Sequence, residues 1–259
     1  MNKNIEFLGL PGSGKSTLYN KIINQKYDNL YSLEKAIDLS TKRAILNYQS
    51  NNKLKMTYRY IIYQLTKNFI YPVYKSNRFI DEEYRNYLVG NPGVIKKILD
   101  LFNELNLNID EKKKLYTWLD RLIAEYSLIK EYLSDNESVV IDEGFVHFST
   151  SIWQRKKPFD NKYYLIEDYI KVVSLPEVLM YINVEPKEAY NRMLKRGRFP
   201  GPYRNLSKED CVNKLLKMKL YIEYLLELID DEVDIIKINN NSSVNRTFRE
   251  LKSNLDKYI

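Results

Sequence analysis

Short apolar runs alternate with longer stretches of helical periodicity along the chain. The runs lie at 5–8, 138–142, 178–184 and 233–238, and acidic or turn residues bound them. Runs of this length, rich in β-branched residues, are typical of central parallel strands covered on both faces. Between them, apolar residues recur every three or four positions at 115–133 and 212–229, which predicts amphipathic helices. The alternation predicts an α/β fold of three layers, with a parallel sheet between helices.

One long stretch, from about residue 41 to 111, breaks this alternation. It has helical periodicity and a turn signal at 91–93, but no convincing central strand. We therefore expect a single domain over 1–259 with a large helical insertion at 41–111. The insertion is rich in tyrosine, including Tyr58, Tyr60, Tyr63, Tyr71, Tyr74, Tyr84 and Tyr87. These rings form either the core of a helical subdomain or a surface that faces an acceptor or lipid.

Composition excludes several classes of protein. Hydrophobic residues make up 44% of the 259 residues and charged residues 29%, which is not a collagen-like, low-complexity or largely disordered balance. The lone cysteine, Cys211, excludes a disulfide framework and fits a reducing compartment. Apolar runs are too short for a signal peptide or a spanning helix. We expect a cytoplasmic protein with no transmembrane segment.

The charge balance favours basic residues, with 41 Lys and Arg against 34 Asp and Glu and a net charge of +7. Most lysines lie singly among acidic residues, as on solvated helix faces. The dense exceptions are 155–157 and 192–208, and the second has a phosphate-binding explanation below. Nucleic acid is therefore not the main partner we expect.

A phosphate-binding loop follows the first apolar run. The segment 9–17 reads Gly-Leu-Pro-Gly-Ser-Gly-Lys-Ser-Thr and matches G-x-x-x-x-G-K-[ST] between a strand and a helix. Glycines let backbone N–H groups surround a phosphate, and the helix N-terminus adds its positive dipole end. The expected nucleotide-binding residues are Gly9, Pro11, Gly12, Ser13, Gly14, Lys15, Ser16 and Thr17. Lys15 would reach the β- and γ-phosphates, and Ser16 would bind Mg²⁺. The guanine-binding Asn-Lys-x-Asp motif is absent, which argues against a GTPase.

Two acidic residues, Asp142 and Glu143, end the second apolar run. One carboxylate at the end of a strand beside a phosphate loop can support Mg²⁺, and another can deprotonate or orient a nucleophile. The sequence leaves open which residue does which, and a solvated acidic pair is the alternative. His147 is expected to form local hydrogen bonds rather than to act as a catalyst.

A basic segment follows the third apolar run. Pro186 is placed to begin a helix that carries Arg192 and Arg196 on one face, and Gly197 ends it before Arg198. Cations that arrive on closure stabilise a transferring phosphoryl group. We expect an arginine-rich lid at 192–208 with a mobile loop at 198–204. A solvated basic helix is the alternative.

Taken together, these elements resemble the thymidylate kinase and deoxynucleoside kinase group of P-loop kinases. Leu119-Asp120-Arg121 followed by Val139-Val140-Ile141-Asp142 looks like that group's Asp-Arg helix and acidic strand, and 190–198 is similar to its arginine-rich lid. The resemblance covers roughly 1–30 and 112–259. Two features depart from the group: Asp142 is followed by Glu143 and Gly144 rather than Arg, and no Arg-Glu-Pro follows the second strand position.

The resemblance implies a five-stranded sheet and an ATP-dependent phosphotransferase that uses ATP and Mg²⁺. Lys15, Asp142, Glu143, Arg192, Arg196 and Arg198 would be catalytic, Ser16 and Asp142 would hold the metal, and Arg121 would face the substrate. The acceptor would be a small molecule, a nucleoside or nucleoside monophosphate. A sugar or surface-polymer precursor, or a regulatory ATPase that uses ATP as a switch, stays open. Members of this group often form homodimers, but no residue pattern decides between monomer and homodimer.

Overall fold

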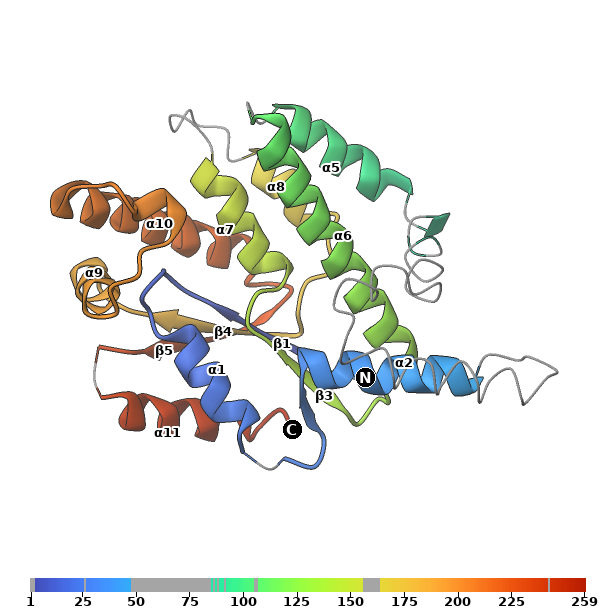
Figure 1. The fold of residues 1–259 in the computed structure, drawn as a ribbon. Helices are drawn as coiled ribbons and strands as arrows, with labels where there is room; N and C mark the ends of the chain where they lie inside the picture. The colour runs from blue at the N-terminus through green and yellow to red at the C-terminus, as the bar shows by residue number, and fades with distance from the viewer. Residues whose placement is uncertain are drawn as a thin grey trace.

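A computed structural model describes residues 3–25, 27–47, 85, 87, 89, 90, 92–104, 107–155, 164–241 and 243–259 (Figure 1). The strands of this part of the chain are β1 (Lys3–Leu8), β2 (Leu30–Ser32), β3 (Ser138–Ile141), β4 (Val178–Asn183) and β5 (Asp234–Asn239). The helices are α1 (Lys15–Ile23), α2 (Leu33–Asn47), α5 (Pro92–Glu104), α6 (Ile109–Tyr132), α7 (Phe145–Arg155), α8 (Tyr164–Ile170), α9 (Pro186–Lys195), α10 (Lys208–Ile229) and α11 (Val244–Leu255).

The five strands form one parallel sheet in the order β2-β3-β1-β4-β5. In β1, Ile5 pairs with Val140 of β3 on one side and with Val178 of β4 on the other. The central strands are apolar on both faces because helices cover both. This confirms the α/β fold class with its parallel sheet, and the four apolar runs of the sequence are β1, β3, β4 and β5.

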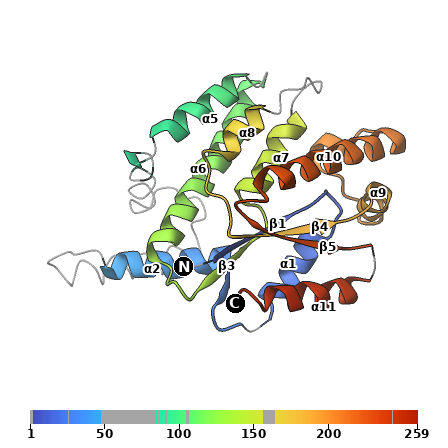
Figure 2. The same cartoon turned by 180° about the vertical axis from the view of Figure 1, so that it is seen from behind.

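Side chains alternate between the two faces of the sheet, and each face has its own core. Ile5 and Phe7 of β1 pack with α1 and α11, whereas Leu8 packs with the larger layer formed by α6, α7, α8 and α10. Figures 1 and 2 show α1 and α11 on one side of the sheet and this larger layer on the other. The two-residue period of a strand thus sorts the apolar side chains of β1 into two cores.

A topological switch point lies between β1 and β3. The helix that follows β1, α1, packs on one face, and the helix that follows β3, α7, packs on the opposite face (Figure 1). In open parallel sheets, ligands bind outside the carboxyl ends of the strands where neighbouring connections diverge in this way. The phosphate loop follows β1 and the acidic pair follows β3, so both predicted motifs lie at this edge.

The second strand position and the insertion were the least visible from sequence. β2 has three residues, too few for a detectable two-residue period. The predicted insertion at 41–111 begins within α2 and ends within α6. Tyr87 is helical and half-buried, while Tyr58, Tyr60, Tyr63, Tyr71, Tyr74 and Tyr84 lie outside the described residues. The insertion therefore stays a prediction.

Within the described ranges, no helix combines the length and apolar character needed to cross a membrane.

A partly buried ion pair joins α2 to the turn before β3. Arg43 donates from Nη2 to Oε1 of Glu137 (2.9 Å) and from Nη1 to the carbonyl of Tyr132 (3.1 Å). Tyr31 of β2 donates its hydroxyl to the same Oε1 (3.1 Å). These contacts, led by the bond from Arg43, lower the pKa of Glu137 to about 2.

Replacing Glu137 with Gln is expected to lower the free energy of unfolding at pH 7 by about 1–3 kcal/mol, because Arg43 loses its charged partner. The pKa of Glu137 is depressed in the folded state, so the carboxylate stabilises the fold above pH 4.5 and this contribution is lost as pH falls toward about 2. Urea denaturation of both proteins at pH 7 and pH 3 measures the difference. A difference of equal size at both pH values would contradict this assignment.

Candidate active site

The phosphate loop runs from the end of β1 into α1 without side chains at its two tightest points. Gly12 has φ +82°, and a Cβ there would lie 2.4 Å from the carbonyl oxygen of Ala189 in α9. Gly14 has φ +92°, precedes α1 as its N-cap, and makes no side-chain cap. The first backbone N–H groups of α1 therefore have no N-cap side chain to donate to. A helix N-terminus of this kind is a natural anion site.

Lys15 lies at the first position of α1 and is directed back across the loop. Its Nζ donates to the carbonyl oxygen of Gly9 (2.9 Å). Burial lowers the pKa of Lys15, and the nearby carboxylates of Asp142 and Glu143 oppose this shift. The sequence-predicted lysine and acidic pair are therefore close enough to interact electrostatically, although 127 positions separate Lys15 from Asp142 (142 − 15).

The turn after β3 carries the predicted acidic pair. Asp142 Oδ1 is buried and, among the described residues, accepts no hydrogen bond. Glu143 is 55% exposed, and desolvation together with Asp142 raises its pKa, while Lys15 and Arg121 oppose the rise. Two neighbouring carboxylates in different environments are suited to different tasks.

A buried acid that the sequence analysis did not single out holds this turn in place. Glu6 of β1 is fully buried and accepts backbone N–H bonds from Val146 (3.2 Å) and His147 (2.6 Å) in the first turn of α7. Burial raises the pKa of Glu6 to about 7 against the backbone hydrogen bonds. Gly144 packs directly on it, since a Cβ there would lie 2.4 Å from Oε2 of Glu6 and 2.5 Å from the hydroxyl of Tyr126. In the sequence, the signal for Glu6 was a single acidic residue inside an otherwise apolar run.

One face of α6 approaches the acidic turn, and we call Trp118, Arg121, Glu125 and the nearby His147 the acceptor face. Arg121 Nε lies 3.4 Å from Oε1 of Glu125, and the Trp118 and His147 rings are 6.3 Å apart. His147 Nε2 lies 3.8 Å from Oε1 of Glu143. Burial and Lys15 lower the pKa of His147 well below its usual value, which favours the neutral ring.

The acceptor face holds buried polar atoms without partners in the described part of the chain. These are Nε1 of Trp118, Oε2 of Glu125 and Nδ1 of His147. Burial raises the pKa of Glu125 to about 7 despite Arg121. Unpaired buried polar groups are costly, so their concentration beside the acidic turn indicates a surface prepared for a polar ligand. The resemblance stated from the sequence implied a substrate role for Arg121 but none for Trp118 and Glu125, which share its helical face at i−3 and i+4.

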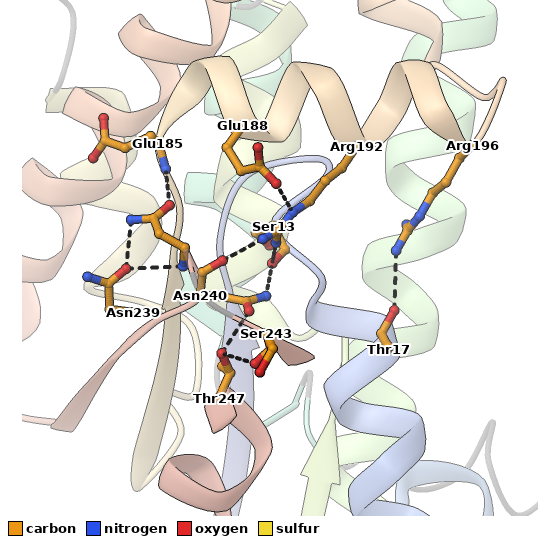
Figure 3. Close-up of polar contacts among 11 residues, drawn as sticks. Ser13, Thr17, Glu185, Glu188, Arg192, Arg196, Asn239, Asn240, Ser243 and Thr247 are labelled. Carbon is orange, nitrogen blue, oxygen red and sulfur yellow. Dashed lines mark hydrogen bonds and ion pairs between the residues drawn. The ribbon is translucent and has the colours of Figure 1, made fainter. Parts of the chain in front are cut away.

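The predicted lid helix is α9, which starts at Pro186 as expected and packs on the phosphate loop. Arg192 lies against the loop, and Arg196 Nη2 donates to Oγ1 of Thr17 (3.2 Å), as Figure 3 shows. Gly197 ends the helix with φ +62°. The segment after it is anchored: Tyr203 is buried and its hydroxyl contacts Sδ of Met218 (3.3 Å). Arg198 follows Gly197 and is exposed.

The donor set fits a magnesium ion held mainly by nucleotide and water. In the described ranges, no cluster of three or more His, Cys, Asp or Glu side chains could hold a metal. Mg²⁺ keeps several waters and takes one or two protein oxygens together with substrate phosphates. The exposed hydroxyl of Ser16 and the unpartnered oxygen of Asp142 are such ligands.

Comparison with known proteins gives a distant likeness. No protein-family model and no curated protein matches the chain. Among solved structures, it is similar to deoxyadenosine kinase from M. mycoides with bound dATP, at 15% identity and a TM-score of 0.48, over 98% of this chain and 100% of that one. The same enzyme with dCMP and a flexible dCDP matches at 14% identity and 0.48, and with dCTP at 17% and 0.45, each over 98% of this chain and 99% of the other. At these identities and TM-scores, the chemistry rests on the geometry above.

Substituting Gly144 with Ala is expected to destabilise the protein by about 1–3 kcal/mol, because the added methyl group overlaps the buried Glu6 carboxyl and Tyr126 hydroxyl. Gly93→Ala is the matched control: nothing lies within 4 Å of its Cβ position in α5, so Ala should be neutral or slightly stabilising. Thermal unfolding of both variants decides. Equal unfolding temperatures would show that Gly144 is not packed as described.

Proposed function

We propose that the chain is an ATP-dependent phosphotransferase that moves the γ-phosphoryl group to a small-molecule acceptor. The observation that carries this proposal is the arrangement at the switch point. Lys15 at the start of α1 interacts electrostatically with the two carboxylates that follow β3. Arg121 of α6 and His147 of α7 lie near one of these carboxylates, that of Glu143. A donor site, a pair of acids and an unpaired polar surface are the parts that phosphoryl transfer requires.

ATP is bound on the α1 side of the site. The backbone N–H groups of Gly12 to Ser16 surround the β-phosphate, and Gly9, Pro11 and Thr17 shape the loop around them. Lys15 exchanges the Gly9 carbonyl for the β- and γ-phosphate oxygens. Ser16 and Asp142 hold Mg²⁺, which when bound neutralises charge on the β- and γ-phosphates.

Glu143 serves the acceptor. Burial and Asp142 raise its pKa, which makes Glu143 a stronger proton acceptor than an ordinary solvated carboxylate. The acceptor hydroxyl oxygen bonds to the γ-phosphorus while the bond from that phosphorus to the β–γ bridging oxygen breaks. The hydroxyl proton passes to Glu143, and ADP leaves with the electron pair of the broken bond. Arg196 and Arg198 of the lid segment stabilise the charge that shifts toward ADP.

The acceptor face favours a hydroxyl-bearing acceptor without a phosphate group. It carries the carboxyl group of Glu125 and one guanidinium, that of Arg121, and the carboxyl group of Glu143 lies beside it. An indole ring beside a neighbouring guanidinium and carboxyl group fits a nucleoside. Its base can stack on the ring and form hydrogen bonds with the two polar groups. The same carboxyl groups can also bind the hydroxyls of a sugar, which keeps a non-nucleotide acceptor as the second candidate.

An acceptor panel tests the proposed function. Purified protein with Mg-ATP is mixed with nucleosides, their 5′-monophosphates and sugars, and ADP and phosphorylated acceptor are quantified. The proposal expects ADP and product in equal amounts, with nucleosides above their monophosphates. Product only with sugars would support the second candidate. ADP with inorganic phosphate and no product would indicate a regulatory ATPase and overturn the phosphotransferase.

Lys15→Ala is expected to lower kcat/KM by about 10²–10³, since a preorganised cation in contact with the phosphates is removed. Lys21→Ala is the control on the same helix; Lys21 contacts Asn245 of α11 and should leave the rate within about twofold. Initial rates with the best acceptor provide the measurement. Unchanged turnover in Lys15→Ala would rule out this donor site.

Asp142→Asn and Glu143→Gln separate the two acids. With Asp142 on the metal, Asp142→Asn should raise the Mg²⁺ concentration for half-maximal rate by about 10–100-fold. With Glu143 as base, Glu143→Gln should lower kcat by about 10²–10⁴ with the Mg²⁺ dependence intact. Magnesium titrations of the rate distinguish them, and the reverse pattern would exchange the two roles.

A further inference from the structure

The structure assigns a positioning role to three residues from three segments. We propose that Arg192 of α9, Asn240 after β5 and Thr247 of α11 form a loop clasp that fixes the orientation of the phosphate loop. The proposal rests on the proposed function in that the loop binds ATP. It gives Arg192 a different task from the lid cations Arg196 and Arg198.

The side chain of Asn240 binds the backbone of the phosphate loop. It is 1% exposed, and its Nδ2 donates to the carbonyl oxygen of Ser13 (2.6 Å). Its own backbone N–H donates to Asn183 at the end of β4 (2.8 Å), which ties the clasp to the sheet. Thr247 is fully buried and donates its hydroxyl to Oδ1 of Asn240 (2.9 Å). Because the Ser13 carbonyl can only accept, Nδ2 rather than Oδ1 faces the loop. The Thr247 hydroxyl, which also lies 3.3 Å from the Ser243 carbonyl oxygen, holds Oδ1 on the other side of the amide.

Arg192 spans the loop and the connection after β5, as Figure 3 shows. Nη1 donates to the Ser13 carbonyl (3.3 Å), Nη2 to the Asn240 carbonyl (2.6 Å), and Nε to Oε1 of Glu188 (2.8 Å). All three guanidinium nitrogens thus have protein acceptors. The rigid fork of an arginine suits this bridge between two carbonyls, which a lysine ammonium would not reproduce.

Holding the Ser13 carbonyl also sets the direction of a phosphate-binding N–H. Ser13 C=O and Gly14 N–H belong to one planar trans peptide, so they point in opposite directions. With the carbonyl directed outward to Asn240 and Arg192, the N–H of Gly14 is directed to the other side, the interior of the loop. Gly14 also lets Asn240 approach, because a Cβ at Gly14 would lie 2.7 Å from Nδ2.

Arg196 differs from Arg192 in what it contacts. Its Nη2 donates to a side-chain hydroxyl, that of Thr17, next to the proposed metal ligand Ser16. Arg196 can leave the loop by breaking one solvent-exposed hydrogen bond, that to Thr17. Arg192 would have to break its contacts to Glu188, Ser13 and Asn240. The two arginines share a helix face, but only Arg192 orients the backbone of the loop.

The test measures amide hydrogen exchange at 13–17 without nucleotide, and then Mg-ATP affinity by calorimetry. Thr247→Val removes the hydroxyl that orients Asn240, and Thr247→Ser keeps it. The N–H of Ser13, which is buried and donates to the Leu10 carbonyl (3.0 Å), reports loosening of the loop. Thr247→Val and Asn240→Ala should speed exchange at Ser13 and raise the Kd for ATP, each by about tenfold, the effect of one lost hydrogen bond. Thr247→Ser should stay within about twofold of the unmodified protein in both.

The arginines supply the second comparison. Arg192→Lys keeps the charge but should still speed exchange at Ser13, while Arg196→Ala should lower kcat at saturating ATP and leave that exchange unchanged. If Arg192→Lys leaves exchange unchanged, or if Thr247→Val and Thr247→Ser behave alike, the clasp is overturned. The exchange readout needs no nucleotide, so a failure of the unmodified protein to bind ATP would contradict the proposed function and leave the clasp to be judged separately.

Discussion

A loop of backbone N–H groups can bind a phosphate only if the carbonyl groups of the same peptides are satisfied elsewhere. The observed contacts follow from this requirement. Lys15 and Ser13 N–H take up the carbonyls of Gly9 and Leu10, and Asn240 with Arg192 takes up that of Ser13. Asn240 leaves no room for a side chain at Gly14, and the Ala189 carbonyl of α9 leaves none at Gly12. The positions of α9 and of the β5–α11 connection depend on the same contacts.

On the opposite side of the switch point, a side chain again satisfies backbone groups. There the side chain accepts from N–H groups, whereas at the phosphate loop side chains donate to carbonyl groups. The carboxyl group of Glu6 receives the free N–H groups at the start of α7, and Gly144 leaves room for it. Neither Asp142 nor Glu143 is the acceptor in these bonds to the helix N-terminus. We infer that this division of labour keeps the acidic pair available for metal and acceptor, with Lys15 as its nearby cation.

Much of the fold and part of the site could be predicted because they depend on local pattern. Central strands covered on both faces are largely apolar, with Glu6 of β1 as an exception, and the phosphate loop is one continuous segment. The remaining contacts join distant residues: Glu6 and His147 are 141 positions apart, and Ser13 and Asn240 are 227 apart. Spacing placed Arg192 and Arg196 on one face, but it carried no information about which carbonyls Arg192 would reach. The roles of Trp118 and Glu125 could not be predicted from sequence, because they depend on the packing of α6 beside the turn after β3.

The central claim is that the loop after β1 recognises the β-phosphate of a nucleotide. Calorimetric titration of the full chain with ATP, ADP and AMP in the presence of Mg²⁺ tests it most directly. The account predicts that ATP and ADP bind and that AMP, which has no β-phosphate, binds at least about 100-fold more weakly, a difference of about 2.7 kcal/mol. AMP bound as tightly as ADP, or no nucleotide bound, would contradict it.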